Sequence, residues 1–222
     1  MARLINLMDE ICNGVEIYYT GRTGGQYLKT AYILCDDYTE LTSKLFLLAQ
    51  DSKWSDKKNG RYKNYHDVQQ DVQSKVRKID PKSLRCVKEM HDAMKERRDR
   101  RNDFFHSTHL LDLGIASRNC VEAFCDLLNY GHLLFDAEWK QAVSAARNLE
   151  VLEIMLRLEK KSFGDPAVTT RVNEILGDLP RNHPTRVPNK GVHVAKYPDD
   201  LHTRLSVIYG GPELRDKLAK LL

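Results

Sequence analysis

One short stretch of the chain, residues 95–106 (KERRDRRNDFFH), gathers four arginines, an asparagine and a histidine. The side chains best suited to chemistry lie at the end of this stretch: Arg101, Asn102 and His106. Arginine keeps its charge and meets phosphate oxygens with parallel donors. Histidine titrates near neutral pH and can take up or release a proton. This combination suits cleavage of RNA without a metal, which needs a base for the 2′-hydroxyl, an acid for the leaving 5′ oxygen and a cation at the phosphate.

The spacing of these residues favours a shared site on a helix. Asn102 and His106 are four residues apart, so a helix would carry them on one face. Arg101 and His106 are about 140° apart around an ideal helix, a gap that a long arginine can span. Arg98 lies four residues before Asn102 and adds a cation to the same face. The competing interpretation is a solvated, charged helix end with a capping histidine.

A second basic stretch, residues 51–65, interrupts the helical pattern of the chain. Its cations alternate with Trp54, Tyr62 and Tyr65, and flat rings among cations suit single-stranded nucleic acid. The alternative is a solvated loop whose aromatic rings pack locally. Residues 181–196 form a further candidate RNA-contacting surface. The side chains that we expect to bind RNA are Arg97, Arg98, Lys57, Lys58 and Arg61.

The elements that must position these side chains are helices. Apolar residues recur at helical spacing in 2–19, 26–50, 66–79, 81–106, 116–135, 136–161, 166–178 and 212–222. Segment 26–50 has a wide apolar face, as expected of a central bundle helix. Asp80 and Pro81 predict the start of the helix 81–106, as N-cap and first helical residue. A bend is expected near Asn148.

The apolar pattern fails in two places. After Met94 the helix 81–106 is almost wholly charged until Phe104, and such a break often marks a functional site. Residues 179–200 contain four prolines, which predicts irregular structure with a candidate strand at 192–195. We therefore expect an all-α fold, with a helical bundle over 1–150 and a mostly helical C-terminal extension over 151–222.

Composition narrows the class of protein. The chain has 222 residues, of which 41% are hydrophobic and 30% charged, and its net charge of +4 excludes a polycation of the chromatin type. No apolar run approaches the roughly 20 residues of a membrane span, and no signal peptide is apparent, so we expect a cytoplasmic protein without a membrane partner. Five cysteines without a CxxC pair predict buried free thiols and no metal site. No cofactor is expected.

The segment RNDFFH (101–106) resembles the motif of the HEPN family. That motif is an arginine, often followed by Asn, Asp or His, and then a histidine after four to six intervening residues. HEPN domains are all-α bundles that carry the motif near the end of a late helix. The resemblance covers roughly residues 1–150 and implies a HEPN-like helical bundle.

The resemblance also implies a function. HEPN proteins are metal-independent endoribonucleases that cleave RNA by attack of the 2′-hydroxyl. By analogy, Arg101 would bind the scissile phosphate, His106 would act as base or acid, and Asn102 would orient the reacting groups. The family implies a homodimer with a composite active site, acting as a toxin or phage-defence effector with a possible antitoxin or defence-complex partner. Toxins paired with a nucleotidyltransferase antitoxin usually carry Tyr two positions after the histidine, where this chain has Thr108.

Two hypotheses of other classes stay open. The chain could be a non-catalytic helical module that dimerises, or that binds nucleic acid or nucleotides through the same arginines. It could also be a subunit that scaffolds a larger complex. Binding of nucleic acid through several phosphates weakens steeply with added salt, so salt-sensitive binding would favour the binding module over the scaffold. Cleavage in EDTA would separate the nuclease from both.

Overall fold

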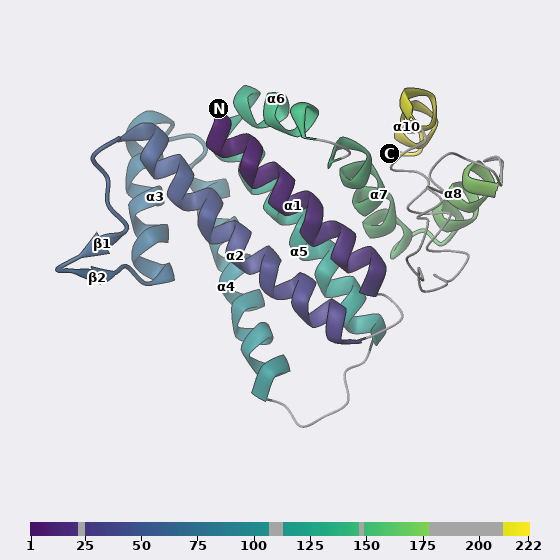
Figure 1. Ribbon diagram of the computed structural model, residues 1–222, viewed down its shortest axis with the longest axis horizontal. Coiled ribbons are helices and arrows are strands. Elements are labelled where there is room, and N and C mark those ends of the chain that lie inside the picture. Colours follow the sequence, from purple (N-terminus) through teal and green to yellow (C-terminus); the bar gives the residue numbers. More distant parts are fainter. Residues whose placement is uncertain (22–24, 107–112, 147–148, 178–210) are drawn as a thin grey trace, which may run out of the picture.

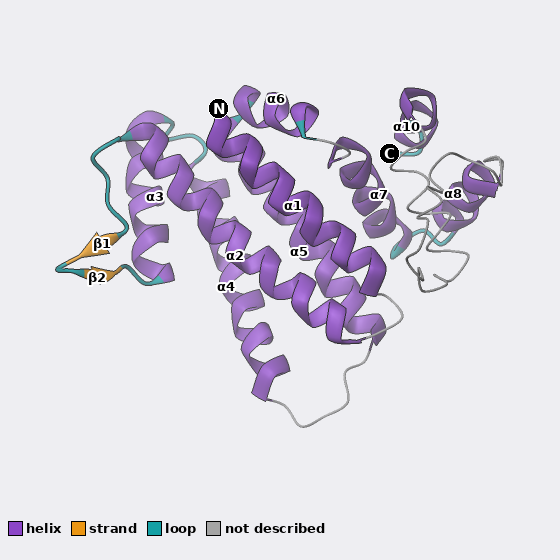
Figure 2. Ribbon diagram, viewed as in Figure 1, coloured by secondary structure: helices purple, strands orange, loops and turns teal. Residues whose placement is uncertain are grey.

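The computed structural model describes residues 1–21, 25–106, 113–146, 149–177 and 211–222, and within them the fold is all-α apart from one small hairpin (Figures 1 and 2). The helices are α1 (Ala2–Gly21), α2 (Gly25–Gln50), α3 (Tyr65–Ile79), α4 (Leu84–His106), α5 (Leu113–Phe135), α6 (Ala137–Ala145), α7 (Leu149–Ser162), α8 (Ala167–Gly177) and α10 (Gly211–Ala219). The hairpin pairs β1 (Lys57–Lys58) with β2 (Arg61–Tyr62). The expected all-α fold class is confirmed for these residues. None of the helices described is both long and apolar enough to cross a membrane.

Helices α1, α2 and α5 form the centre of the bundle. Helix α2 packs along both α1 and α5, and Figure 1 shows α1 and α2 side by side in front of α5. Their apolar stripes are buried against one another, as the helical spacing predicted. The fully buried side chains here include Met8, Ile11, Tyr18, Leu28, Phe46, Phe124, Leu127 and Leu128.

The remaining helices flank this centre. Helices α3 and α4 pack on one side of α2, and α6 and α7 contact α1 and α5 on the other. Helix α7 buries Leu152 and Leu156 in the same core as α5. The expected domain boundary between residues 150 and 151 therefore falls inside a helix of the bundle. Helices α8 and α10 pack against α7, at the end of the molecule opposite the hairpin (Figure 1).

A buried chain of hydrogen bonds holds α4 in register with three neighbours. The Tyr130 hydroxyl of α5 lies 2.9 Å from the Ser43 hydroxyl of α2 and 2.8 Å from His91 Nε2 of α4. On its other nitrogen, His91 is 3.0 Å from the Gln73 amide of α3. Burial lowers the pKa of His91 to about 4, so the imidazole is neutral at pH 7. His91 is therefore a structural residue that links α4 to α3 and α5.

Three local expectations are corrected by the structure. Helix α4 begins at Leu84 rather than at 81, because Asp80 ends α3 and accepts a hydrogen bond from the Ser83 hydroxyl in the intervening turn. Ile79, one of the apolar residues at helical spacing in the predicted helix 66–79, is 50% exposed rather than buried. All five cysteines are free thiols, but Cys86 is exposed while the other four are buried.

The loop expected over residues 51–65 contains the hairpin. Asn59 and Gly60 have positive φ angles of 53° and 77°, the arrangement of a two-residue type I′ turn. Asn-Gly is the preferred pair for this turn, so the signal was present in the sequence. Two other expectations, the strand at 192–195 and the RNA-contacting surface at 181–196, lie outside the described residues.

Candidate functional site

The expected catalytic residues lie at the C-terminal end of α4. The helix continues through His106, so Asn102 and His106 occupy positions one helical turn apart. Asn102 is exposed and Arg101 is partly buried. The side chain of His106 lies outside the described residues. The helical backbone therefore allows Arg101, Asn102 and His106 to share a site. The side-chain positions are described for Arg101 and Asn102.

Arg101 is held by two neighbours. Its Nη1 donates to Asp36 Oδ2 of α2 in an ion pair. Its Nη2 and Nε donate to Asn102 Oδ1 over 3.0 and 3.4 Å. The Arg101 side chain is 18% exposed. Asp36 thus fixes the direction of the guanidinium and offsets its charge, while Asn102 brings an exposed amide against it.

Arg98 connects α4 to both α2 and α3. Its Nε lies 3.5 Å from Asp36 Oδ2, and its Nη2 lies 3.4 Å from Glu40 Oε2. The guanidinium carbon lies 4.2 Å from the centre of the Tyr65 ring, a cation–π contact with the first residue of α3. Its buried Nη1 has no hydrogen-bond partner among the described residues. Arg98 therefore anchors this end of α4 from two sides.

The other two arginines differ sharply from each other. Arg97 forms an ion pair with Asp126 of α5. Arg100 is exposed and pairs within its own helix, 2.5 Å from Glu96. Arg97 and Arg98, both expected to bind RNA, have their charges engaged by acidic side chains within the bundle. That role stays a prediction for both.

The acids of α2 lie in a poorly hydrated setting. Burial raises the pKa of Asp36, and the nearby guanidinium groups of Arg98 and Arg101 offset only part of this effect. Burial also raises the pKa of Asp37. A cavity of about 20 Å³ beside Asp36 holds roughly one water molecule. A nucleotide cannot enter it, so a substrate would meet Arg101 and Asn102 at the surface.

The hairpin carries the remaining candidate RNA-binding residues. Lys57, Lys58 and Arg61 are all exposed, and no acid among the described residues pairs with them. Lys63, by contrast, forms a 2.8 Å ion pair with Asp71. The structure therefore divides the expected RNA-binding cations into arginines on α4 that are paired with acids and cations on the hairpin that are not.

Sequence reasoning missed the acids that organise the arginines. Asp36 and Glu40 interrupt the apolar stripe of α2, and this break was the available signal. The described residues contain no group of three or more His, Cys, Asp or Glu side chains that could hold a metal ion. Comparison of the chain with protein-family models, curated proteins and solved structures gives no match.

Proposed function

We propose that the protein is a metal-independent endoribonuclease of HEPN type. One observation carries the proposal: the Arg101 guanidinium is fixed by Asp36 and Asn102 near the C-terminal end of α4, five residues before His106. A phosphate-binding cation must be held in direction to stabilise charge in a transition state. The resemblance of residues 101–106 to the HEPN motif supports the same reaction, and a role as toxin or phage-defence effector.

The proposed reaction needs no group from outside the protein and the RNA. The ribose 2′ oxygen attacks the adjacent phosphorus while a base takes its proton. The bond from phosphorus to the 5′ oxygen breaks, and an acid protonates that oxygen. The products are a 2′,3′-cyclic phosphate and a 5′-hydroxyl. Arg101 stabilises charge on the phosphate oxygens, Asn102 orients the reacting groups, and His106 acts as base or acid.

The homodimer expected from the resemblance belongs to this proposal, because two copies would supply one imidazole for each proton transfer. An apolar stripe on α2, exposed at two of its four residues, supports it. Residues at seven-residue spacing form the stripe: Tyr27, Leu34, Leu41 and Leu48. Tyr27 is 45% and Leu41 44% exposed, although both are large apolar side chains.

The proposal is tested by incubating wild type and single variants with RNA in EDTA and mapping the product ends. We expect cleavage by wild type and a loss of about 10²- to 10⁴-fold in His106→Ala. Asn102→Ala should also lose activity without unfolding, because Asn102 is exposed. Arg101→Lys keeps a charge for Asp36 but lacks the forked donors, so it should cleave far more slowly than wild type.

Arg100→Ala is the matched control. It removes a whole charge from the adjacent position, whereas Arg101→Lys keeps one, but Arg100 is exposed and pairs only with Glu96 of its own helix among the described residues. Its activity should stay within about two-fold of wild type. Equal losses in Arg100→Ala and Arg101→Lys would refute the assigned site. Cleavage that continues in His106→Ala would refute the mechanism.

A second function has one specific observation in its favour. The hairpin cations pair with no acid among the described residues, whereas Arg101 is paired with Asp36. This arrangement fits a module that binds nucleic acid without cutting it. Salt-sensitive binding of RNA that stays intact in EDTA would support this second function over the first. An antitoxin or defence-complex partner stays a prediction.

A further inference from the structure

The hairpin of β1 and β2 is an exposed element with an unusual arrangement of charge. Its register places Lys58 opposite Arg61 and Lys57 opposite Tyr62. Because side chains alternate between the two faces of a strand, Lys58 and Arg61 share one face, while Lys57 and Tyr62 share the other. Figure 1 shows the hairpin extending away from the helices.

The pairing of Lys58 with Arg61 opposes hairpin stability. Like charges directly opposite each other in an antiparallel pair are destabilising. Both side chains are exposed, and no acid within the described part of the chain relieves their repulsion. This repulsion lowers the stability of the hairpin and is not offset by another contact of these two side chains among the described residues. Such a pattern indicates a ligand, and two adjacent cations suit a phosphate.

The opposite face presents an aromatic ring to solvent. Tyr62 is 71% exposed, the highest value among the large hydrophobic side chains that are exposed in the described residues. The Lys57 Nζ lies 4.9 Å from the centre of its ring. An exposed ring beside a cation is the combination that stacks on an unpaired base while meeting a neighbouring phosphate.

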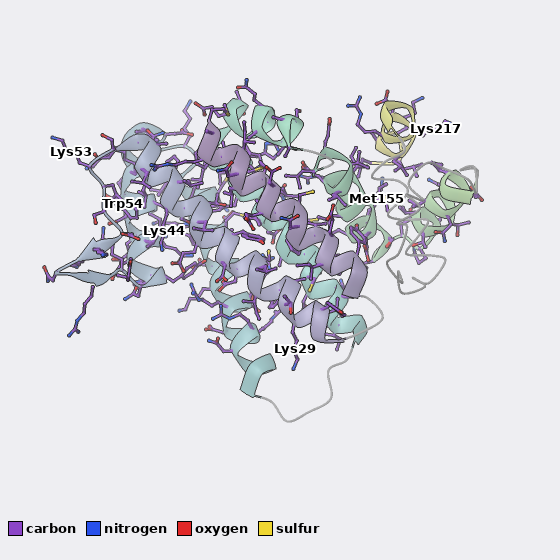
Figure 3. The ribbon with its side chains drawn as sticks, in the orientation of Figure 1. Lys29, Lys44, Lys53, Trp54, Met155 and Lys217 are labelled. Atoms are coloured by element: carbon purple, nitrogen blue, oxygen red, sulfur yellow. The ribbon has the colours of Figure 1, made fainter. Side chains whose placement is uncertain are left out.

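The base of the hairpin is fixed to the bundle, so its cations are not merely part of a solvated loop. Asp71 of α3 accepts hydrogen bonds from Trp54 Nε1 over 2.9 Å and from Lys63 Nζ over 2.8 Å. Lys63 also lies 4.8 Å from the centre of the Trp54 ring. Figure 3 shows Lys53 at the outer edge of this region and Trp54 closer to the fold. Trp54 and Lys63 therefore serve structure, which leaves the exposed hairpin residues for binding.

The hairpin lies near the arginines of α4, because α3, which follows it, begins beside Arg98. After β2, Asn64 caps α3 by accepting a 2.9 Å hydrogen bond from the Asp67 amide. The next residue, Tyr65, stacks against Arg98. Figure 1 shows the hairpin and the C-terminal half of α4 on the same side of α2. A strand bound at the hairpin could therefore continue toward Arg101.

We propose that the hairpin is a docking site for single-stranded RNA, with Lys58 and Arg61 holding a phosphate and Tyr62 stacking on an unpaired base. This inference deepens the proposed function and rests on it for the identity of the polymer. A duplex keeps its bases stacked on one another and does not offer them to Tyr62. The site would therefore select unpaired segments for cleavage.

Binding is measured with the full chain carrying His106→Ala, so that bound RNA stays intact. The probes are a fluorescent 12-nucleotide oligouridylate, a 12-base-pair RNA duplex and a polyglutamate of similar charge. Their binding is measured by fluorescence anisotropy at several salt concentrations. The hairpin variants are the double variant Lys58→Gln/Arg61→Gln, and the single variants Tyr62→Ala and Tyr62→Phe. All three residues are exposed, so the core is untouched. Tryptophan fluorescence, measured in a Trp139→Phe background so that Trp54 alone emits, checks that the hairpin base stays folded.

Arg77→Gln/Lys78→Gln is the control for the double variant. It removes one lysine and one arginine, both exposed, from the other end of α3, about 20 Å along the helix from the hairpin. The hairpin double variant should weaken oligouridylate binding about ten-fold and lower the log–log salt slope by about 0.7, for the one phosphate that Lys58 and Arg61 hold together. The control should change the affinity less than about two-fold.

Tyr62→Ala should weaken oligouridylate binding about ten-fold without affecting the duplex, and Tyr62→Phe should bind like the parent. The proposal is overturned if the hairpin variants bind as the parent does, if the control loses as much affinity, or if polyglutamate binds as tightly as oligouridylate. Cleavage is assayed separately with His106 intact. Hairpin-dependent binding without cleavage would support the docking site and refute the nuclease. Cleavage that is unaffected by the hairpin variants would support the nuclease and refute the docking site.

Discussion

Asp36 of α2 forms an ion pair with Arg101 of α4, although the two residues are 65 positions apart in the chain. The same carboxylate lies 3.5 Å from Arg98. One partly buried acid therefore orients two arginines of the candidate site. This relationship makes Asp36 a positioning residue for the proposed reaction.

Asp36→Asn should separate binding from turnover. Loss of the negative charge should raise RNA affinity several-fold, because Arg101 is then free to attract phosphate. Loss of the fixed direction should lower turnover about 10- to 100-fold. Steady-state cleavage should thus show a lower KM together with a lower kcat.

Asp37→Asn is the control for this split. Asp37 is more exposed than Asp36 and forms no ion pair with Arg101, and its substitution removes the same charge from the next position. It should raise affinity slightly and leave kcat unchanged. If the two variants behave alike, Asp36 contributes only its charge and does not position Arg101.

Leu41→Glu should dissociate the proposed homodimer. Leu41 is 44% exposed on the stripe of α2, so a charge there is tolerated in the monomer but would be buried between two copies. Sedimentation should show a dimer for wild type and a monomer for the variant, which should also lose cleavage. Ile79→Glu, at an exposed apolar residue of α3, should remain dimeric. A monomeric wild type would exclude the composite site.

The buried His91 should make stability depend on pH. Its folded pKa of about 4 lies below the usual 6.5, so the unfolded chain binds a proton that the folded protein excludes. The resulting stability is present above pH 6.5 and is lost as the pH falls toward 4, by about 1.4 kcal/mol per pH unit and roughly 3 kcal/mol in all.

Urea unfolding between pH 4 and 7 measures this loss. His91→Gln is less stable at pH 7 because it disturbs the contacts to Tyr130 and Gln73, but it should take up about one proton fewer on unfolding near pH 5. His66→Gln, at an exposed histidine, should keep the wild-type slope. An unchanged slope in His91→Gln would show that another group causes the dependence.

Gly131→Ala should destabilise the bundle through one contact. A Cβ at Gly131 would overlap the ring of Trp139, which is fully buried. We expect a cost of about 1–3 kcal/mol in the free energy of unfolding, since the ring cannot shift without disturbing its neighbours. Gly164→Ala is the matched control, because its Cβ would come no nearer than 3.9 Å to the Lys161 carbonyl oxygen. Equal stability of the two variants would contradict this account of Trp139 packing.

Helical periodicity was enough to predict most of the fold. The apolar spacing of residues 26–50 predicted α2 to within one residue at its start, because burial of a continuous stripe along one helix face is a local property of the sequence. The hairpin within residues 51–65 was not predicted, because its strands are two residues long and carry no alternating apolar pattern. Only the Asn59–Gly60 pair signalled it.

By itself, the sequence determined which segments are helical, which faces are apolar, and that four arginines lie in one turn-and-a-half of α4. It also determined the Arg100–Glu96 pair, because residues four apart on a helix are neighbours. Only the tertiary structure decided that Asp36 holds Arg101, that Asp126 holds Arg97, and that Tyr62 is exposed while Trp54 is bonded to Asp71. These contacts join residues far apart in the chain, and they depend on how the packed helices are rotated and offset, which helical periodicity alone does not specify.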